Sequence, residues 1–198
     1  VLQSAQALKT AGFKDWSLDM LSGLPGDSVK SFEASLRQAL ELQPTHVSVY
    51  DLIIEEGTAF GWWFSEKEGR GVQQGAKRGS LPGEDESAAM YRTAHRVLSA
   101  AGYEHYEISN YALMPEAVRE RDPSGEALLP SPFRSKHNLV YWRREPFLAF
   151  GMGATSFVGN ARLKRPVTLP AYLQWVSDGG DAASLVGDQE EEEEEEEG

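Results

Sequence analysis

The sequence predicts an α/β fold in which strands alternate with helices. Short segments rich in apolar and β-branched residues, typical of strands, alternate with longer segments whose apolar residues recur at helical spacing. Glycine or proline closes most of these segments. The order strand, helix, strand, helix, strand is typical of right-handed parallel crossovers. The expected product is a barrel or an open parallel sheet, and both bind ligands at the C-terminal ends of their strands.

Four elements are expected in the first 52 residues. Gly12 ends the first helix, and Gly23-Leu24-Pro25-Gly26 forms a turn after the first strand. Asp27 or Ser28 is expected to cap the second helix, and Pro44 breaks it. The apolar residues of the second helix are Val29, Phe32, Leu36 and Leu40. In order, the elements are a helix over 1–11, a strand over 16–21, a helix over 29–40 and a strand over 46–52.

A long connection separates these elements from the next helix. Residues 55–83 are polar and glycine-rich, and we expect them to form a loop. A helix is expected from about Glu84 to Ala101, with an acidic first turn that suits the helix dipole. Gly102 ends it, and residues 103–109 are expected to form one further strand. The predicted buried stripe of the helix consists of Met90, Ala94, Val97, Leu98 and Ala101.

The last part of the chain is less regular. A tight turn is expected at Gly151-Met152-Gly153, which is not a dinucleotide fingerprint because Ser156 occupies the third glycine position. Residues 169–176 have the pattern of a short helix. The predicted organisation is one domain over 1–112, a surface loop or insertion over 113–136, the start of a small C-terminal region over 137–178, and a disordered acidic tail over 179–198.

Composition excludes several classes of function. The net charge is −12, but Glu190 to Glu197 supply eight negative charges, so the rest carries −12 + 8 = −4. There is no basic stripe for nucleic acid and no apolar run long enough to span a membrane. The chain has no cysteine, so it offers no disulfide, thiolate ligand or thiol nucleophile. It starts at Val1 within a helical pattern, and we expect it to be a piece of a longer protein.

Asp19 is a candidate ligand-binding residue, because it is a carboxylate within an apolar strand. Alternation places it on one face with Ser17 and Leu21. A carboxylate inside a barrel is costly unless it is paired or hydrogen-bonded. Asp19 either accepts hydrogen bonds from a ligand, such as ribose hydroxyls, or is bonded to a neighbouring loop.

The hexapeptide His137-Asn138-Leu139-Val140-Tyr141-Trp142 combines an imidazole, an amide, a phenol and an indole. Imidazole is a good axial ligand for haem iron, and aromatic rings pack on a porphyrin face. On composition alone, a packed aromatic corner with a capping histidine is the alternative. The remaining histidines, His46, His95 and His105, are expected to be surface or satisfied structural residues without zinc-site spacing.

Several short strings, in this order and spacing, resemble the radical S-adenosylmethionine (SAM) proteins of the coproporphyrinogen III oxidase-like family, and most closely its haem-chaperone branch. The resemblance covers roughly Phe13 to Val176. The strings are Asp19-Met20-Leu21-Ser22-Gly23-Leu24-Pro25-Gly26, His46-Val47-Ser48-Val49-Tyr50, Ile54-Glu55-Glu56-Gly57-Thr58, Leu81-Pro82, Ala101-Gly102-Tyr103, Tyr106-Glu107-Ile108-Ser109-Asn110-Tyr111-Ala112, the His137 hexapeptide and Gly151-Met152-Gly153-Ala154.

The resemblance implies that this chain is the C-terminal part of a partial (β/α) radical SAM barrel, followed by the start of a C-terminal region. A missing N-terminal half would hold the cysteines of a [4Fe-4S] cluster. By motif position, Asp19, Ile53 and Phe157 would contact SAM. The family's haem-binding motif maps onto His137, Asn138, Tyr141 and Trp142. The connection over 115–136 is longer than usual and lacks the cysteine often found before the histidine, so an insertion there would move His137.

Three functions follow from the resemblance. The first is a haem chaperone that uses a [4Fe-4S] cluster and SAM, binds haem and delivers it to an acceptor protein. The second is oxygen-independent coproporphyrinogen III oxidase, which decarboxylates a porphyrinogen with a SAM-derived radical. The third is a fragment with no activity of its own. The family default is a cytoplasmic location, with plastid or mitochondrion as alternatives.

Overall fold

The computed structural model describes residues 1–64, 79–116 and 129–180. The chain divides into two compact units, Val1–Ser135 and Lys136–Gly198, and each is considered by itself. Most of the expected acidic tail, and the central parts of the expected 55–83 and 113–136 loops, lie outside the described residues. No helix of the described residues is long and apolar enough to cross a membrane.

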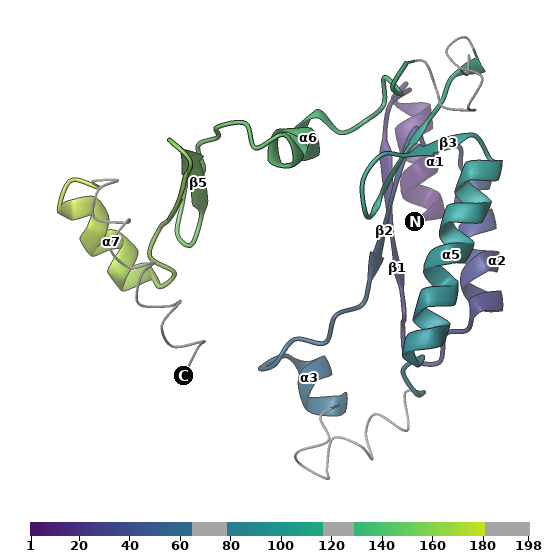
Figure 1. Cartoon of the computed structure of the whole chain (residues 1–198), viewed down its shortest axis with the longest axis horizontal. Helices are drawn as coiled ribbons and strands as arrows, with labels where there is room; N and C mark the ends of the chain where they lie inside the picture. Colours follow the sequence, from purple (N-terminus) through teal and green to yellow (C-terminus); the bar gives the residue numbers. More distant parts are fainter. Residues whose placement is uncertain (65–78, 117–128, 181–198) are drawn as a thin grey trace. The chain divides into compact units, whose positions relative to one another are not determined.

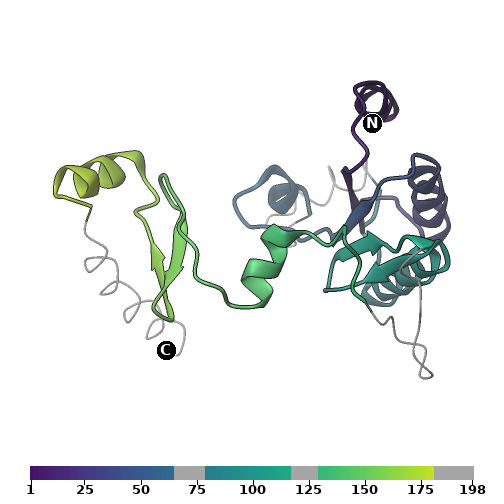
Figure 2. The same ribbon diagram turned by 90° about the horizontal axis from the view of Figure 1, so that it is seen from above.

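The first unit contains a four-stranded sheet with helices packed on one face (Figure 1). The spatial order of the strands is β1-β2-β4-β3. Figures 1 and 2 both show α2 and α5 side by side on the same face of this sheet. The elements are α1 (Leu2–Thr10), β1 (Ser17–Ser22), α2 (Val29–Glu41), β2 (His46–Asp51), α3 (Ala59–Phe64), α5 (Glu84–Ala100), β3 (Tyr103–His105) and β4 (Asn110–Leu113).

The predicted parallel crossover is confirmed for β1, α2 and β2. The two strands pair in parallel, with Ser17 opposite His46 and Ser22 opposite Asp51. Ser28 is the N-cap of α2, and its hydroxyl accepts a hydrogen bond from the Ser31 N–H at 3.2 Å. The Ser31 hydroxyl in turn accepts from the Ser28 N–H at 2.9 Å, which completes a capping box.

The prediction of a single strand over residues 103–109 is wrong. Residues 106–109 form a turn, and the chain doubles back as β3 and β4. The two strands are antiparallel, and β4 also pairs antiparallel with β2. The edge strand β3 therefore runs in the same direction as β2, as a crossover requires, but β4 lies between them. The turn breaks the strand because Tyr106 bonds back to the hairpin, its N–H donating to the Asn110 carbonyl at 3.2 Å.

The core lies between the sheet and the pair α2 and α5. Four of the five residues predicted for the stripe of α5 are buried, and Thr93 joins them. Ala101 is wrong as a core residue: it lies after the end of α5 and is exposed. The main cluster consists of Phe32, Leu36, Val47, Val49, Met90, Ala94, Val97, Leu98, Tyr103 and Tyr111.

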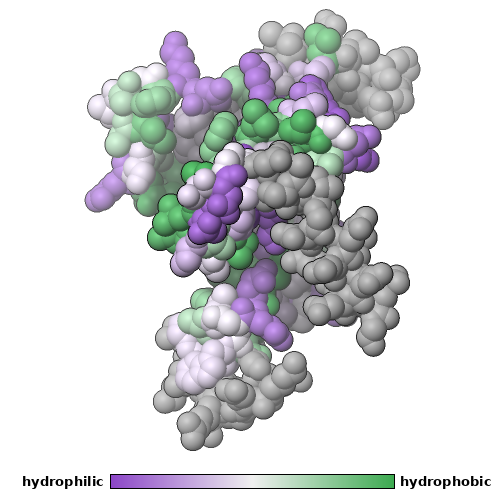
Figure 3. All heavy atoms as spheres, turned by 90° about the vertical axis from the view of Figure 1, so that its left-hand side faces the viewer, coloured by the Kyte–Doolittle hydropathy of each residue, from purple (hydrophilic) through white to green (hydrophobic). Residues whose placement is uncertain are grey.

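The second unit consists of α6 (Lys136–Trp142), a two-stranded sheet of β5 (Thr155–Val158) and β6 (Ala161–Lys164), and α7 (Leu169–Ser177). The strands are joined by Gly159 and Asn160, which both have positive φ, as a two-residue hairpin turn requires. Helix α7 confirms the prediction for 169–176. Several apolar side chains remain exposed on this unit. Figure 3 shows hydrophobic residues, in green, beside hydrophilic ones on the face of the molecule that it draws.

Candidate functional site

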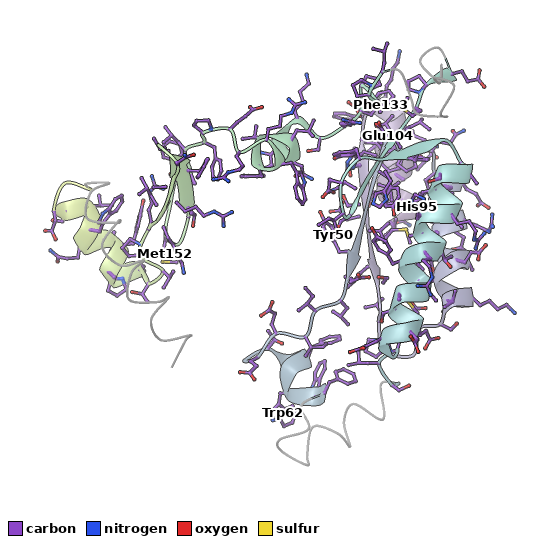
Figure 4. The ribbon with its side chains drawn as sticks, in the orientation of Figure 1. Tyr50, Trp62, His95, Glu104, Phe133 and Met152 are labelled. Carbon is purple, nitrogen blue, oxygen red and sulfur yellow. The ribbon has the colours of Figure 1, made fainter. Side chains whose placement is uncertain are left out.

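The face of the sheet opposite α2 and α5 carries the polar residues of the first unit. Val47, Val49 and Tyr111 point into the helix-covered core, so their neighbours along each strand point to the other face. In register across that face lie Asp19, Ser48 and Asn110. Figure 4 shows Tyr50 on the side of the sheet away from α5, and His95 on the α5 side. We call this row of Asp19, Ser48 and Asn110 the open-face row.

Asp19 is exposed on this face of the first unit. Ser17 and Leu21 are exposed as well, as expected from the alternation that places them on the same face as Asp19. Ile53, the second predicted SAM contact, follows the end of β2 and is 74% exposed. Both residues therefore remain accessible to a ligand within the first unit.

Asn110 is a candidate that the sequence analysis did not single out. Its side chain is buried, with only 3% exposed, yet its Oδ1 atom accepts no hydrogen bond from the described residues. A buried amide oxygen without a partner is uncommon in native proteins and costs free energy. This acceptor fits a polar ligand that donates a hydrogen bond. The available signal was an asparagine inside the apolar string that forms β4.

His46 lies at the start of β2 and confirms the prediction of a satisfied structural histidine. Its Nδ1 lies 3.0 Å from the Ser17 hydroxyl and its Nε2 lies 2.8 Å from the Tyr106 hydroxyl. Burial lowers the pKa of His46, which favours the neutral ring. The Tyr106 hydroxyl also accepts from the Ser135 N–H at 3.1 Å. The network connects β1 and β2 to the last residue of the first unit.

The turn after β1 lies where the C-terminal ends of β1 and β2 meet. Its Gly26 N–H donates to the Ser80 carbonyl at 2.8 Å, and a Cβ added to Gly23 would meet Leu52 and Pro82. Gly79 has φ +94 and packs so closely on Gly26 that a Cβ would lie 2.8 Å from its backbone. The Gly-Leu-Pro-Gly and Leu-Pro strings thus meet in space, although more than fifty residues separate them.

The hexapeptide of His137 forms helix α6 in the second unit. His137 and Tyr141 lie one turn apart on it, with the His137 Nε2 atom 3.0 Å from the Tyr141 hydroxyl. The helix brings these two predicted residues together, with their rings edge to face at a centroid separation of 5.0 Å. Trp142 is 53% exposed, and Asn138 is half-buried.

A cavity of about 280 Å³ lies next to this helix, within the second unit. The Tyr141 ring meets the Phe147 ring edge to face at 4.7 Å, and Phe147 packs against Phe157 at 6.1 Å. The lining residues are Tyr141, Arg144, Phe147, Phe157 and Arg162. Phe157, predicted as a SAM contact, therefore forms part of this cavity wall. No local sequence pattern predicts the cavity, because its lining comes from segments about twenty residues apart.

The turn predicted at Gly151-Met152-Gly153 is confirmed. Gly151 and Gly153 have positive φ, and the Ala154 N–H donates to the Gly151 carbonyl at 3.3 Å. In the second unit this turn leads into β5.

The described residues contain no cluster of metal-binding side chains. No group of three or more His, Cys, Asp or Glu side chains in the described residues is placed to hold a metal ion. His95 and His105 approach each other, with their Nδ1 atoms 3.2 Å apart, and His105 stacks on Tyr111 at 4.2 Å. They form a pair of structural histidines on the face of the sheet that α5 covers.

Comparison with solved structures identifies a similar fold. Coproporphyrinogen III oxidase (HemN) from Escherichia coli, described as a radical SAM enzyme, matches with a TM-score of 0.58 over 90% of this chain and 37% of that chain. The sequence identity is 20%, so this match shows the fold alone. The α/β fold of this chain is thus similar to the fold of part of that enzyme. No protein-family model matches the chain.

The particular relatives are haem chaperones. The chain is 36% identical over 174 residues to "Heme chaperone HemW" of Synechocystis sp., covering 88% of this chain and 36% of that protein. It is 32% identical over 174 residues to the protein of that name from Lactococcus lactis, covering 88% of this chain and 39% of the relative.

A vertebrate protein is also similar. "Radical S-adenosyl methionine domain-containing protein 1, mitochondrial" of Danio rerio is 33% identical over 138 residues, covering 70% of this chain and 25% of that protein. The chain therefore spans about a third of the length of these curated relatives. The matches confirm the predicted resemblance to the haem-chaperone branch of the coproporphyrinogen III oxidase-like radical SAM proteins.

Proposed function

We propose that this chain is part of a haem chaperone, a protein that binds haem and transfers it to an acceptor protein. The observation that carries the proposal is the arrangement of α6, where an exposed imidazole and a phenol lie together beside an aromatic cavity. The names of the relatives support the same function.

His137 is the proposed axial ligand of the haem iron. Its side chain is exposed, so iron can approach it without a large rearrangement of the unit. The Tyr141 hydroxyl next to its Nε2 atom can orient the ring. Trp142 and Asn138 lie on the same short helix and complete the motif. An exposed site suits a carrier, because the ligand of an acceptor can replace His137 there.

The open-face row is the proposed contact with SAM in the first unit. Asp19 can accept hydrogen bonds from ligand hydroxyls, and Asn110 contributes an unused buried acceptor. Ile53 adds an apolar contact at the end of β2. The chain has no cysteine, so none of its residues fits the thiolate ligation of a [4Fe-4S] cluster. When bound, SAM and a cluster would supply radical chemistry, which the residues here could only position.

A haem titration of the full chain, followed by absorbance, tests the proposal. We expect a saturable shift of the Soret band in the unaltered chain. Transfer to an acceptor is then tested by mixing the loaded chain with an apo-haem protein and following the acceptor's spectrum. If the chain binds no haem while a longer form carrying the cluster cysteines cleaves SAM in the presence of coproporphyrinogen, the oxidase is the better assignment.

The cellular compartment of the protein is a further prediction. The cytoplasm is the family default, whereas the name of the Danio rerio relative places that protein in mitochondria. Fractionation of cells that express the complete protein distinguishes these compartments.

A further inference from the structure

The cavity beside α6 contains two cations among aromatic rings. Tyr141, Phe147 and Phe157 form its apolar wall, and Arg144 and Arg162 contribute guanidinium groups. The guanidinium carbon of Arg144 lies 5.9 Å from the centre of the Phe157 ring. Such a lining suits a flat apolar molecule that also carries negative charge.

Neither arginine has a carboxylate partner in the described part of the chain. Other arginines of the molecule are paired: Arg134 with Glu104 at 2.5 Å, and Arg143 with Glu145 at 3.6 Å. Arg144 and Arg162 are in no such pair among the described residues. Two guanidinium groups that share one cavity repel each other, so a bound anion would stabilise both.

The backbone holds Arg144 in place at the end of α6. Its φ is 53°, a left-handed conformation that residues other than glycine adopt infrequently. The Arg144 N–H donates to the Tyr141 carbonyl at 3.0 Å, and the Glu145 N–H donates to the Val140 carbonyl at 2.9 Å. This turn ends the helix and sets the side chain of Arg144 against Phe157 rather than along α6.

Tyr141 connects the cavity to the proposed iron ligand. Its ring lines the cavity, and its hydroxyl lies 3.0 Å from His137 Nε2. A cavity of about 280 Å³ is smaller than a whole tetrapyrrole, so it would hold one edge of the ring while iron lies outside it. The propionates of haem project from one edge, and guanidinium is the group best shaped to bind carboxylates by paired hydrogen bonds.

We propose that Arg144 and Arg162 bind the propionate carboxylates of haem, with the ring edge against Tyr141, Phe147 and Phe157. This inference rests on the proposed haem-binding function and adds a requirement for free carboxylates. The site therefore selects carboxylate-bearing tetrapyrroles over their esters.

The test compares haem with haem dimethyl ester, which has no free carboxylate. Both are titrated into the full chain and into Arg144→Gln, Arg162→Gln and the double variant. Arg143→Gln is the matched control, since Arg143 is adjacent in sequence, 61% exposed and paired with Glu145 outside the cavity lining.

We expect each cavity variant to bind haem about tenfold more weakly, the size of one lost charge-assisted contact. The double variant should bind haem as weakly as the unaltered chain binds the diester. The diester should bind all forms equally, and this equality also reports that the aromatic wall is intact. Arg143→Gln should match the unaltered chain.

Two results overturn the inference in different ways. Haem affinity that stays the same in the double variant, while His137→Ala alters the Soret band, contradicts the role of the arginines and leaves the proposed function standing. Failure of the unaltered chain to bind either haem or the diester contradicts the proposed function, and the inference fails with it.

Discussion

At the scale of single residues, the first unit presents an exposed carboxylate, Asp19, in register with Asn110, whose buried amide oxygen has no hydrogen-bond partner among the described residues. Asp19 is exposed on the face of the sheet that α2 and α5 leave uncovered, and Asn110 lies in the same register row. The sequence could place Asp19 on a strand face by alternation. It could not show that Asn110 is buried without a partner, because that depends on how β4 packs between β2 and β3.

Asp19→Asn is expected to weaken SAM binding by about 1–3 kcal/mol, the cost of one impaired polar contact that the bound ligand covers. The amide keeps one acceptor oxygen but loses the charge and the second acceptor. Calorimetry with SAM measures the effect in the longer, cluster-bearing protein that the resemblance implies. Asp85→Asn, an exposed carboxylate in the first turn of α5, is the control. An affinity equal to that of the unaltered protein would remove Asp19 from the SAM site.

At the scale of elements, periodicity predicted the longer helices well but missed the short helices α3 and α6 and both hairpins. The spacing of apolar residues placed α2, α5 and α7 within a few residues of their bounds. The turn between β3 and β4 was missed because residues 103–109 contain no glycine or proline to signal it. The hairpin of β5 and β6 did carry a signal, since Gly159-Asn160 is a sequence suited to a two-residue turn.

Helix α2 depends on its N-cap. Ser28→Ala removes the acceptor for the Ser31 N–H and is expected to lower the free energy of unfolding by about 1 kcal/mol. Chemical denaturation of both proteins measures the difference. The control is Ser35→Ala, which changes the same residue type within the helix, where alanine is the better helix former. Equal losses for the two variants would mean that the cap contributes nothing specific.

A half-buried ion pair between Glu104 and Arg134 holds the last segment of the first unit against β3. The Glu104 carboxylate accepts from the Arg134 Nε at 2.8 Å and from the Ser131 N–H at 3.0 Å. Figure 4 shows Glu104 near Phe133. Burial by itself would raise the pKa of Glu104, but the hydrogen bonds from Arg134 and Ser131 lower it below its ordinary value. This pair therefore holds the end of the first unit against β3.

Glu104→Gln is expected to destabilise the chain by about 1–3 kcal/mol at neutral pH. A carboxyl whose pKa is lowered by folding contributes stability that is present above its unfolded pKa, here about 4.3, and lost as the pH falls through the folded value. The difference between variant and unaltered chain should therefore shrink below about pH 4.

Denaturation midpoints at pH 7 and pH 3.5 check this dependence. Glu33→Gln is the control. Glu33 forms ion pairs with Arg37 and Arg96, and both arginines are exposed. Ion pairs in contact with solvent contribute little to stability. A Glu104→Gln deficit that stays constant with pH would show that packing, not charge, is lost.

At the scale of the whole molecule, the residues proposed to bind SAM and those proposed to bind haem lie in different units. The open-face row lies in Val1–Ser135, and the haem motif with its cavity lies in Lys136–Gly198. The motifs predict both sites by residue number, and the structure adds the cavity and its two arginines. Such features depend on side chains that meet only after folding, so no local pattern signals them.

A haem titration of the full chain beside His137→Ala and His95→Ala tests whether α6 is the haem site. The His95 variant is the control, because His95 lies on α5 in the first unit and pairs with His105. We predict a saturable Soret shift that His95→Ala preserves and His137→Ala loses or moves to a different wavelength. Identical spectra for the His137 variant and the unaltered chain would contradict the assignment of α6 as the haem site.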